Sequence, residues 1–220
     1  MSCAICNTRK EKRSCPAKGA GICPVCCATE REVTLDCPLD CEYLTAAHRH
    51  EKSEAAFDIE KAPNRDIAIT EQFLEEYQVP MALIGTALVD GALKVDGKAT
   101  DYDAREALQS LIQTLRAASS GLVVEAELVN PYAVAIRESL EARIAEFRRL
   151  EAKATGKTLT DDETVLKMLV FLQRLEFANN NGRRYSKAFL GFLNGFRLQM
   201  PDVEEAAAEM AAAEAPRVIL

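Results

Sequence analysis

The chain has 220 residues, of which 48% are hydrophobic and 28% are charged. This composition is too apolar for a disordered chain and too charged for a membrane protein, and the length suits one large domain or a domain with a small module. The net charge of -7 argues against a protein that coats nucleic acid with a broad basic face.

The cysteines are distributed unevenly, because all eight lie within the first 41 residues. The N-terminal residues hold no apolar run long enough for a signal peptide, and no stretch approaches the roughly 18 uncharged residues of a membrane span. We therefore expect a cytoplasmic protein with no membrane partner. In that compartment thiols stay reduced, so clustered cysteines indicate metal or redox chemistry rather than disulfides.

The spacing of the cysteines favours zinc. Two CxxC pairs are separated by sixteen residues, within the range of tetrahedral zinc sites. An iron–sulfur cluster would lack the usual Cys-x2-Cys-x2-Cys run, and a redox pair would lack a βαβ setting. We predict two zinc ions as cofactors, with His48 and His50 as substitute ligands. The predicted ligands are Cys3, Cys6, Cys15, Cys23, Cys26, Cys27, Cys37 and Cys41.

The pairing of ligands to metals stays open at this point. Cys26 and Cys27 are adjacent, and adjacent side chains in extended chain point opposite ways, which favours a different metal for each. One wiring places Cys3, Cys6, Cys23 and Cys26 on the first zinc and Cys15, Cys27, Cys37 and Cys41 on the second. This interleaved order would make a cross-braced module.

The cysteine and histidine motifs of this segment occur in the order Cys3/Cys6, Cys15-Pro16, Cys37/Cys41 and His48. In this order, residues 3–50 resemble the small cross-braced zinc fingers of the MYND and HIT type. The resemblance implies a treble-clef or cross-brace zinc module that binds other proteins, sometimes within nucleic-acid machinery. The whole chain also resembles uncharacterised bacterial proteins in which such a finger is fused to a helical domain.

Local patterns outline the zinc-binding module, which we place at residues 1–56. Polar and apolar residues alternate over 30–35, as in a short strand. Asp36 is a candidate cap for a helix that begins near Pro38 and carries Tyr43, Leu44 and His48. Because about 50 residues make too small a core, we expect the metal to supply much of the folding free energy.

Helical periodicity dominates from residue 66 onward and predicts a mostly α protein. Six helices are expected within an α-helical domain over residues 60–200, which we interpret as a bundle of five to seven helices. Residues 121–129 suit a strand or a loop, and the Ala/Glu-rich tail at 201–220 is expected to be loosely attached. The expected helices cover about 66–79, 81–93, 101–120, 131–155, 161–176 and 185–198.

Two basic segments are candidate sites for an anion or a partner. The first holds Arg9, Lys10, Lys12 and Arg13; these cations would contact phosphates or offset the charge of metal-bound thiolates. The second holds Arg183, Arg184 and Lys187 at the start of a predicted helix, where the helix dipole already favours anions. A phosphate, an acidic partner or glutamates of the bundle would each relieve that conflict.

No catalytic residue is predicted. The sequence lacks the glycine-rich, P-loop, HExxH and GxSxG motifs, and both histidines lie in the zinc region. Two acidic clusters are interpreted as charges that favour helix N-termini rather than as metal ligands. They are Asp101, Asp103 and Glu106, and Asp161, Asp162 and Glu163.

The sequence therefore favours a non-enzymatic zinc-binding protein, in which a protein-interaction or adaptor module sits on a helical scaffold. One alternative is a nucleic-acid or ribosome-associated protein that uses segments 9–18 and 183–187. The other is an enzyme that uses an open zinc site or a reactive thiol. The partner and the oligomeric state stay open.

Overall fold

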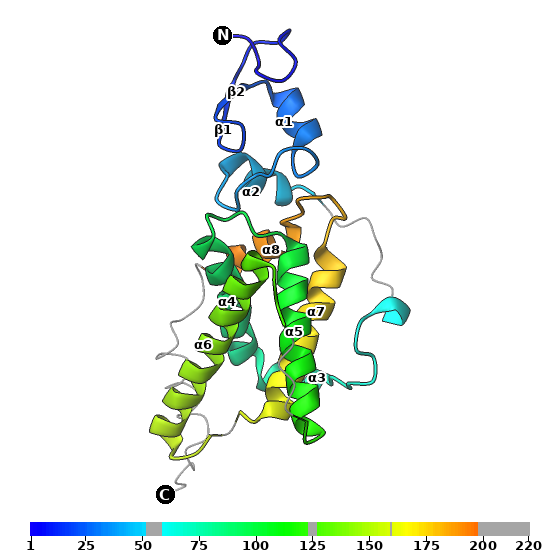
Figure 1. Cartoon of the computed structure of the whole chain (residues 1–220), viewed down its shortest axis with the longest axis vertical. Coiled ribbons are helices and arrows are strands. Elements are labelled where there is room, and N and C mark those ends of the chain that lie inside the picture. The colour runs from blue at the N-terminus through cyan, green and yellow to red at the C-terminus, as the bar shows by residue number, and fades with distance from the viewer. Residues whose placement is uncertain (52–58, 123–126, 159, 198–220) are drawn as a thin grey trace, which may run out of the picture.

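The computed structural model describes residues 1–51, 59–122, 127–158 and 160–197. A small cysteine-rich module occupies one end of the long axis, and a bundle of helices occupies the rest (Figure 1). The prediction of a mostly α protein is confirmed. The tail at 201–220 and the centre of the segment at 121–129 lie outside the described residues.

The cysteine module, as we call residues 1–51, begins with a β-hairpin. Strands β1 (Arg13–Cys15) and β2 (Ala20–Ile22) pair antiparallel, with Ser14 opposite Gly21. Helices α1 (Pro24–Glu30) and α2 (Glu42–His48) follow. Seven of the ten residues in its buried cluster are cysteines, so hydrocarbon burial contributes little to holding the module together.

Two local predictions for the module were wrong. Residues 30–35 form no strand, because the amides of Val33, Thr34 and Leu35 all donate to the carbonyl of Glu30, which folds the segment into a turn. The helix expected near Pro38 begins instead at Glu42.

The helical bundle (residues 59–197) starts with a short 3₁₀ turn, η1 (Ile59–Lys61), and confirms the expected number of helices over the described residues. Its helices are α3 (Glu71–Glu76), α4 (Gln78–Lys94), α5 (Asp101–Ser119), α6 (Pro131–Thr155), α7 (Asp162–Asn179) and α8 (Ala188–Arg197). None of the helices in these ranges is long and apolar enough to cross a membrane.

The helix boundaries follow the capping residues that the sequence displays. Thr100 forms a capping box with Asp103, Asn130 and Asp161 cap α6 and α7, and Gly156 ends α6 at a φ of 76°. The first predicted helix is shorter than expected, since Ile67 and Ile69 precede the N-cap Thr70 and pack on the core from a non-helical segment.

Close packing of α4 on α6 forms the centre of the bundle. A Cβ atom on Gly91 would lie 2.6 Å from the Cα of Ile136, so only glycine allows the two helices to approach this closely. α5 packs on both α6 and α7, and α8 packs on α4. The result is one continuous core of leucine, isoleucine, valine and alanine side chains.

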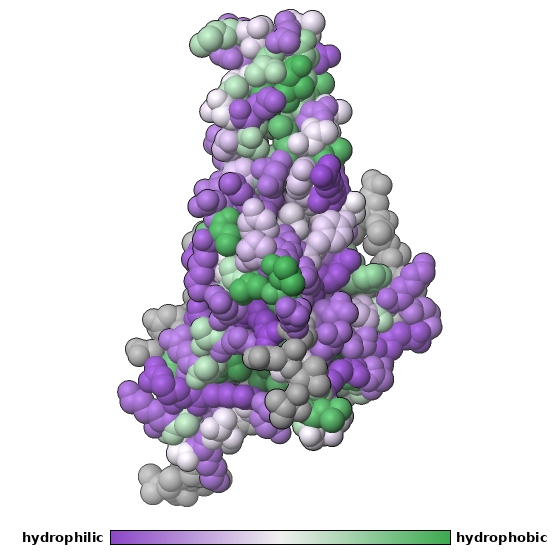
Figure 2. All heavy atoms as spheres, viewed as in Figure 1, coloured by the Kyte–Doolittle hydropathy of each residue, from purple (hydrophilic) through white to green (hydrophobic). Residues whose placement is uncertain are grey.

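One residue of the cysteine module belongs to this bundle core. Leu39 is 2% exposed, packs with the buried residues of the bundle, and donates its amide to the carbonyl of Gly97 at 3.0 Å. The module is therefore attached to the bundle by packing and a hydrogen bond as well as by the covalent chain. It projects as a narrow lobe from the wider helical body, and its base is embedded in that body (Figure 2).

Candidate metal centre

Four of the predicted cysteine ligands meet in the cysteine module. The sulfur atoms of Cys3, Cys6, Cys23 and Cys26 all lie within 4.8 Å of one another. This set is the first group of the one wiring described above, among pairings that the sequence left open. Among the described residues, it is the one set of cysteines that meets this distance.

The local backbone explains how the two CxxC pairs converge. Cys23 is the N-cap of α1, and its sulfur accepts the amide of Cys26 at 3.4 Å. Cys26 lies in the first turn of the same helix, so both thiols face one point at the helix N-terminus. The other pair lies on a tight turn, in which the amide of Asn7 donates to the carbonyl of Cys3 and Asn7 has a φ of 54°.

The electrostatics of these thiols suits a cation. Burial alone raises the pKa of Cys3, but amides of Cys6, Cys23 and Ile5 outweigh it and lower the pKa. Hydrogen bonds from the Thr8 side chain and from nearby amides lower the pKa of Cys6 to about 5. Burial and then the neighbouring thiols raise the pKa of Cys26 to about 12, because a further negative charge is unfavourable there. A divalent cation removes that conflict, so the donor set fits a thiolate-binding metal.

The remaining cysteines gather at the base of the module. Cys15, Cys27, Cys37 and Cys41 are at most 9% exposed and share one buried cluster. Burial raises the pKa of Cys37 to about 11, and the charges of Cys41, Cys15 and Cys27 act in the same direction. Burial also raises the pKa of Cys15. This second group stays a prediction as a metal site.

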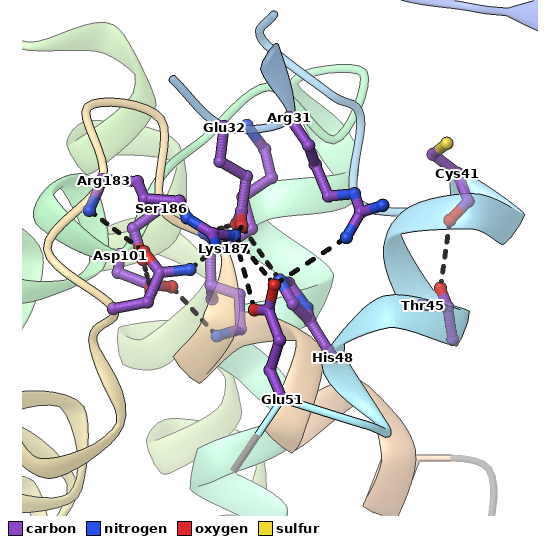
Figure 3. Close-up of polar contacts among 12 residues, drawn as sticks. Arg31, Glu32, Cys41, Thr45, His48, Glu51, Asp101, Arg183, Ser186 and Lys187 are labelled. Carbon is purple, nitrogen blue, oxygen red and sulfur yellow. Dashed lines mark hydrogen bonds and ion pairs between the residues drawn. The ribbon is translucent and has the colours of Figure 1, made fainter. Parts of the chain in front are cut away.

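His48, a predicted substitute ligand, lies away from both groups of thiols. Its Nε2 is 3.1 Å from Oε2 of Glu32, a carboxylate with a fully buried side chain (Figure 3). Glu51 completes a set of three potential ligands within 4.8 Å, but Nη1 of Arg183 bridges the two carboxylates at 3.1 and 3.0 Å. The arrangement is therefore satisfied as an ion-pair network. His50, the other substitute, is exposed after the end of α2.

This network joins the module to the start of α8. Glu32 accepts the amide of Lys187 at 2.6 Å and the side-chain amide of Asn181 at 2.9 Å. Burial alone raises the pKa of Glu32, but the hydrogen bonds from His48, Lys187 and Asn181 outweigh it and hold the pKa below its usual range. Nζ of Lys187, whose side chain is fully buried, donates to Asp36 at 2.7 Å.

The second predicted basic segment is thus used largely within the chain. Arg183 and Lys187 pair with carboxylates of the cysteine module rather than of the bundle. Arg184 lies over the ring of Tyr185, with 5.1 Å between its guanidinium carbon and the ring centroid. The suggestion that an external anion binds this segment stays a prediction.

The first basic segment divides into two kinds of residue. The arginines face the thiols, since the pKa of Arg9 is raised by a hydrogen bond with Cys23 and Nη1 of Arg13 lies 3.3 Å from the sulfur of Cys27. Such contacts offset the charge of metal-bound thiolates. Lys10 and Lys12 are exposed, and phosphate binding by them stays a prediction.

The acidic clusters behave as the helix-terminal charges that we expected. Asp161 caps α7 by accepting the amide of Thr164, and Asp162 pairs with Arg148. Asp103 belongs to the capping box of α5. Asp101, which is fully buried, also caps a different helix, because its carboxylate accepts the amides of Phe189 and Leu190 in the first turn of α8.

Sequence reasoning missed two residues that matter here, Glu32 and Asp36. Glu32 has a φ of 59°, a conformation that a glutamate rarely adopts and that no local pattern indicates. Asp36 is no helix cap, contrary to the prediction, and its partner Lys187 is 151 residues away along the chain.

Comparison with known proteins adds no relative. No family model matches the chain, and no curated protein or solved structure matches it either. The likeness to MYND and HIT fingers therefore rests on the quoted cysteine and histidine positions alone.

Proposed function

We propose that the chain is a zinc-dependent, non-enzymatic interaction protein, in which the cysteine module presents a binding surface on the helical scaffold. The observation that carries the proposal is the convergence of Cys3, Cys6, Cys23 and Cys26. Four sulfur ligands suit zinc in a tetrahedral site. Four protein ligands also leave no position for a catalytic water, which favours a structural rather than a catalytic metal.

A second zinc would be held by Cys15, Cys27, Cys37 and Cys41. These thiols are buried together, and Arg13 offers a positive charge beside Cys27. Their ionisation would require a compensating cation, because buried thiolates without one are unfavourable. Two closed sites in one small module support a role in holding its fold.

Metal analysis tests the proposal directly. We expect about two zinc ions per chain, and the cobalt-substituted protein should show intense thiolate-to-cobalt absorption bands. Cys23→Ser should lower the metal content by one, and Cys27→Ser should do the same independently. Ser14→Ala, on the exposed face of β1, serves as the matched control. Purified protein with less than one zinc per chain would refute the proposal.

The adaptor part of the proposal is supported by the rigid base of the module and by two exposed apolar side chains. Val25 on α1 and Val33 after it are 52% and 45% exposed. Figure 2 shows apolar residues gathered on the outer part of the narrow lobe. Paired substitution of both valines by serine should abolish capture of a protein partner and leave the metal content unchanged.

Nucleic-acid binding is the second candidate function, favoured by the exposed lysines Lys10, Lys12 and Lys18 of the hairpin. It would have to depend on these lysines, because Arg183 and Lys187 are already paired. We expect RNA affinity, if this function holds, to fall steeply with salt and to fall further in the triple alanine variant. Binding that is insensitive to both changes would exclude it.

A further inference from the structure

An apolar cavity in the bundle, remote from the cysteines, is the second feature that suggests binding. It has a volume of about 600 Å³ and lies between the segment that precedes α3 and one face of α7. Its walls include Ile67, Ile69, Leu74 and Phe171. Cavities of this size and character are typical of sites for small molecules.

A second cavity of about 290 Å³ lies next to the first, toward α8. Both cavities are lined by Leu74, Phe171 and Leu175, so they are neighbours along α7. The second is almost wholly apolar, and its outer wall is formed by Phe192 and Phe196, which are 40% and 45% exposed. One of its few polar groups, the hydroxyl of Thr86, already donates to the carbonyl of Leu83.

The polar end of this space carries a guanidinium. Arg174 lines the larger cavity and donates to the backbone carbonyls of Pro63, Asn64 and Ile67 through Nε and Nη2. Among the described residues, no ion pair of Arg174 with a carboxylate is found: Asp66, which acts on it at longer range, pairs with Arg116 at 2.7 Å, and desolvation lowers the pKa of Arg174. None of these hydrogen bonds uses Nη1.

The other charges of the larger cavity balance each other. Arg65 pairs with Glu60 at 2.8 Å, and both side chains are more than half exposed. The lining residues therefore carry one formal positive charge, on Arg174, which is opposed only by Asp66 at a longer range than an ion pair. A local positive charge at the mouth of an apolar space matches a molecule with an anionic head and a hydrocarbon tail.

We propose that these neighbouring cavities together bind an aliphatic carboxylate, with the carboxylate on Arg174 and the chain extending past Leu74, Phe171 and Leu175 toward Phe192 and Phe196. The proposal is independent of the metal centre. The carboxylate forms a charge-assisted hydrogen bond with Nη1, and the hydrocarbon chain removes the exposed apolar wall from water.

Isothermal titration of the metal-loaded full chain with decanoate and with decanol tests this assignment. We expect decanoate to bind about tenfold more tightly than decanol, since the charge-assisted hydrogen bond is absent in the alcohol. Arg174→Met should remove that preference, so that the two probes bind equally, and Arg174→Lys should keep most of it. Equal affinity for both probes in the unmodified protein would overturn the assignment.

A second pair of variants tests the position of the hydrocarbon chain. Ala82 lines the smaller cavity and is part-exposed, so Ala82→Phe should fill the space without disturbing the core and should abolish binding. Ala145→Phe, on the exposed face of α6, is the matched control and should bind like the unmodified protein. Failure of decanoate to bind at millimolar concentration, or equal binding by both variants, would overturn the proposal.

Discussion

The cysteine module and the helical bundle are held together in different ways. Cysteines make up most of the buried cluster of the module, whereas the bundle buries a continuous set of mainly aliphatic side chains from helices α4 to α8. If the module binds metal as proposed, its stability is concentrated in a few metal–sulfur bonds. In the bundle it is spread over many small contributions, of which no single one is decisive.

The two regions nevertheless meet at a boundary that is held by apolar packing and by an ion pair. Leu39 packs in the bundle core only two residues from Cys37 and Cys41, and Asp36 holds the buried Lys187. A metal bound at the base of the module would thus fix the chain on either side of Leu39. Loss of structure in the module should therefore destabilise the start of α8 before it destabilises the centre of the bundle.

Removal of the metal should have the largest effect. A structural zinc contributes about 10 kcal/mol to the apparent folding free energy, so chelation should unfold the cysteine module. We expect hydrogen exchange to lose protection over residues 3–48 and at the first turn of α8, while α5 and α6 keep theirs. Unchanged protection in the module, once metal loss has been verified, would contradict the view that bound metal holds the module together.

The ion pair between the buried Lys187 and the part-exposed Asp36 should come next. Asp36→Ala leaves the ammonium group of Lys187 buried without its partner, and we expect a loss of about 3 kcal/mol in the free energy of unfolding. Lys187→Met removes the buried charge itself and should cost clearly less. Denaturant titration measures both, with unchanged metal content as the control. Equal losses would mean that the pair does not couple the two regions.

The contrast between the regions also decides what the sequence could predict. Helices α4 to α8 were predictable, because Thr100, Asn130, Asp161 and Gly156 act locally and the apolar periodicity is long. The meeting of Cys3, Cys6, Cys23 and Cys26 was likewise encoded in two CxxC spacings. The helix caps, the apolar periodicity and the CxxC spacings are all local signals, because each can be recognised in a short stretch of sequence.

The boundary was not predictable, because its signals are not local. Glu32 adopts a positive φ, and the alternating residues around it suggested a strand that the structure lacks. Lys187 was predicted as part of an anion or partner site at the start of a helix, yet its side chain is fully buried and pairs with Asp36. Pairing across some 150 residues depends on tertiary packing, which no short window of sequence contains.

The cap that Asp101 provides for α8 should show a specific pH dependence. Burial raises the pKa of this carboxyl to about 6, so the folded state binds the proton more tightly than the unfolded state. Its contribution to stability is therefore full at acid pH, below the unfolded value near 3.8, and is lost as the pH rises through about 6. The wild type should gain about 1 kcal/mol relative to Asp101→Asn between pH 7 and pH 5.

Parallel unfolding titrations of the two proteins at several pH values provide the measurement. Both carry the same cysteines, so the pH dependence of metal binding cancels in the difference between them. A difference that stays flat from pH 7 to pH 5 would show that the Asp101 carboxyl titrates at its ordinary pKa. The opposite slope would mean that the folded state lowers the pKa.

The smallest effect is expected from a helix cap inside the bundle. Thr100→Ala removes the side chain that accepts the amide of Asp103, and should lower the free energy of unfolding by about 1 kcal/mol. Thr100→Ser keeps the hydroxyl and should recover most of the loss. Metal content should stay the same in both variants, because this cap lies in the bundle and touches none of the cysteines. A loss as large as that of Asp36→Ala would contradict the view that bundle stability is distributed, since one local cap would then count as much as the ion pair of a buried lysine.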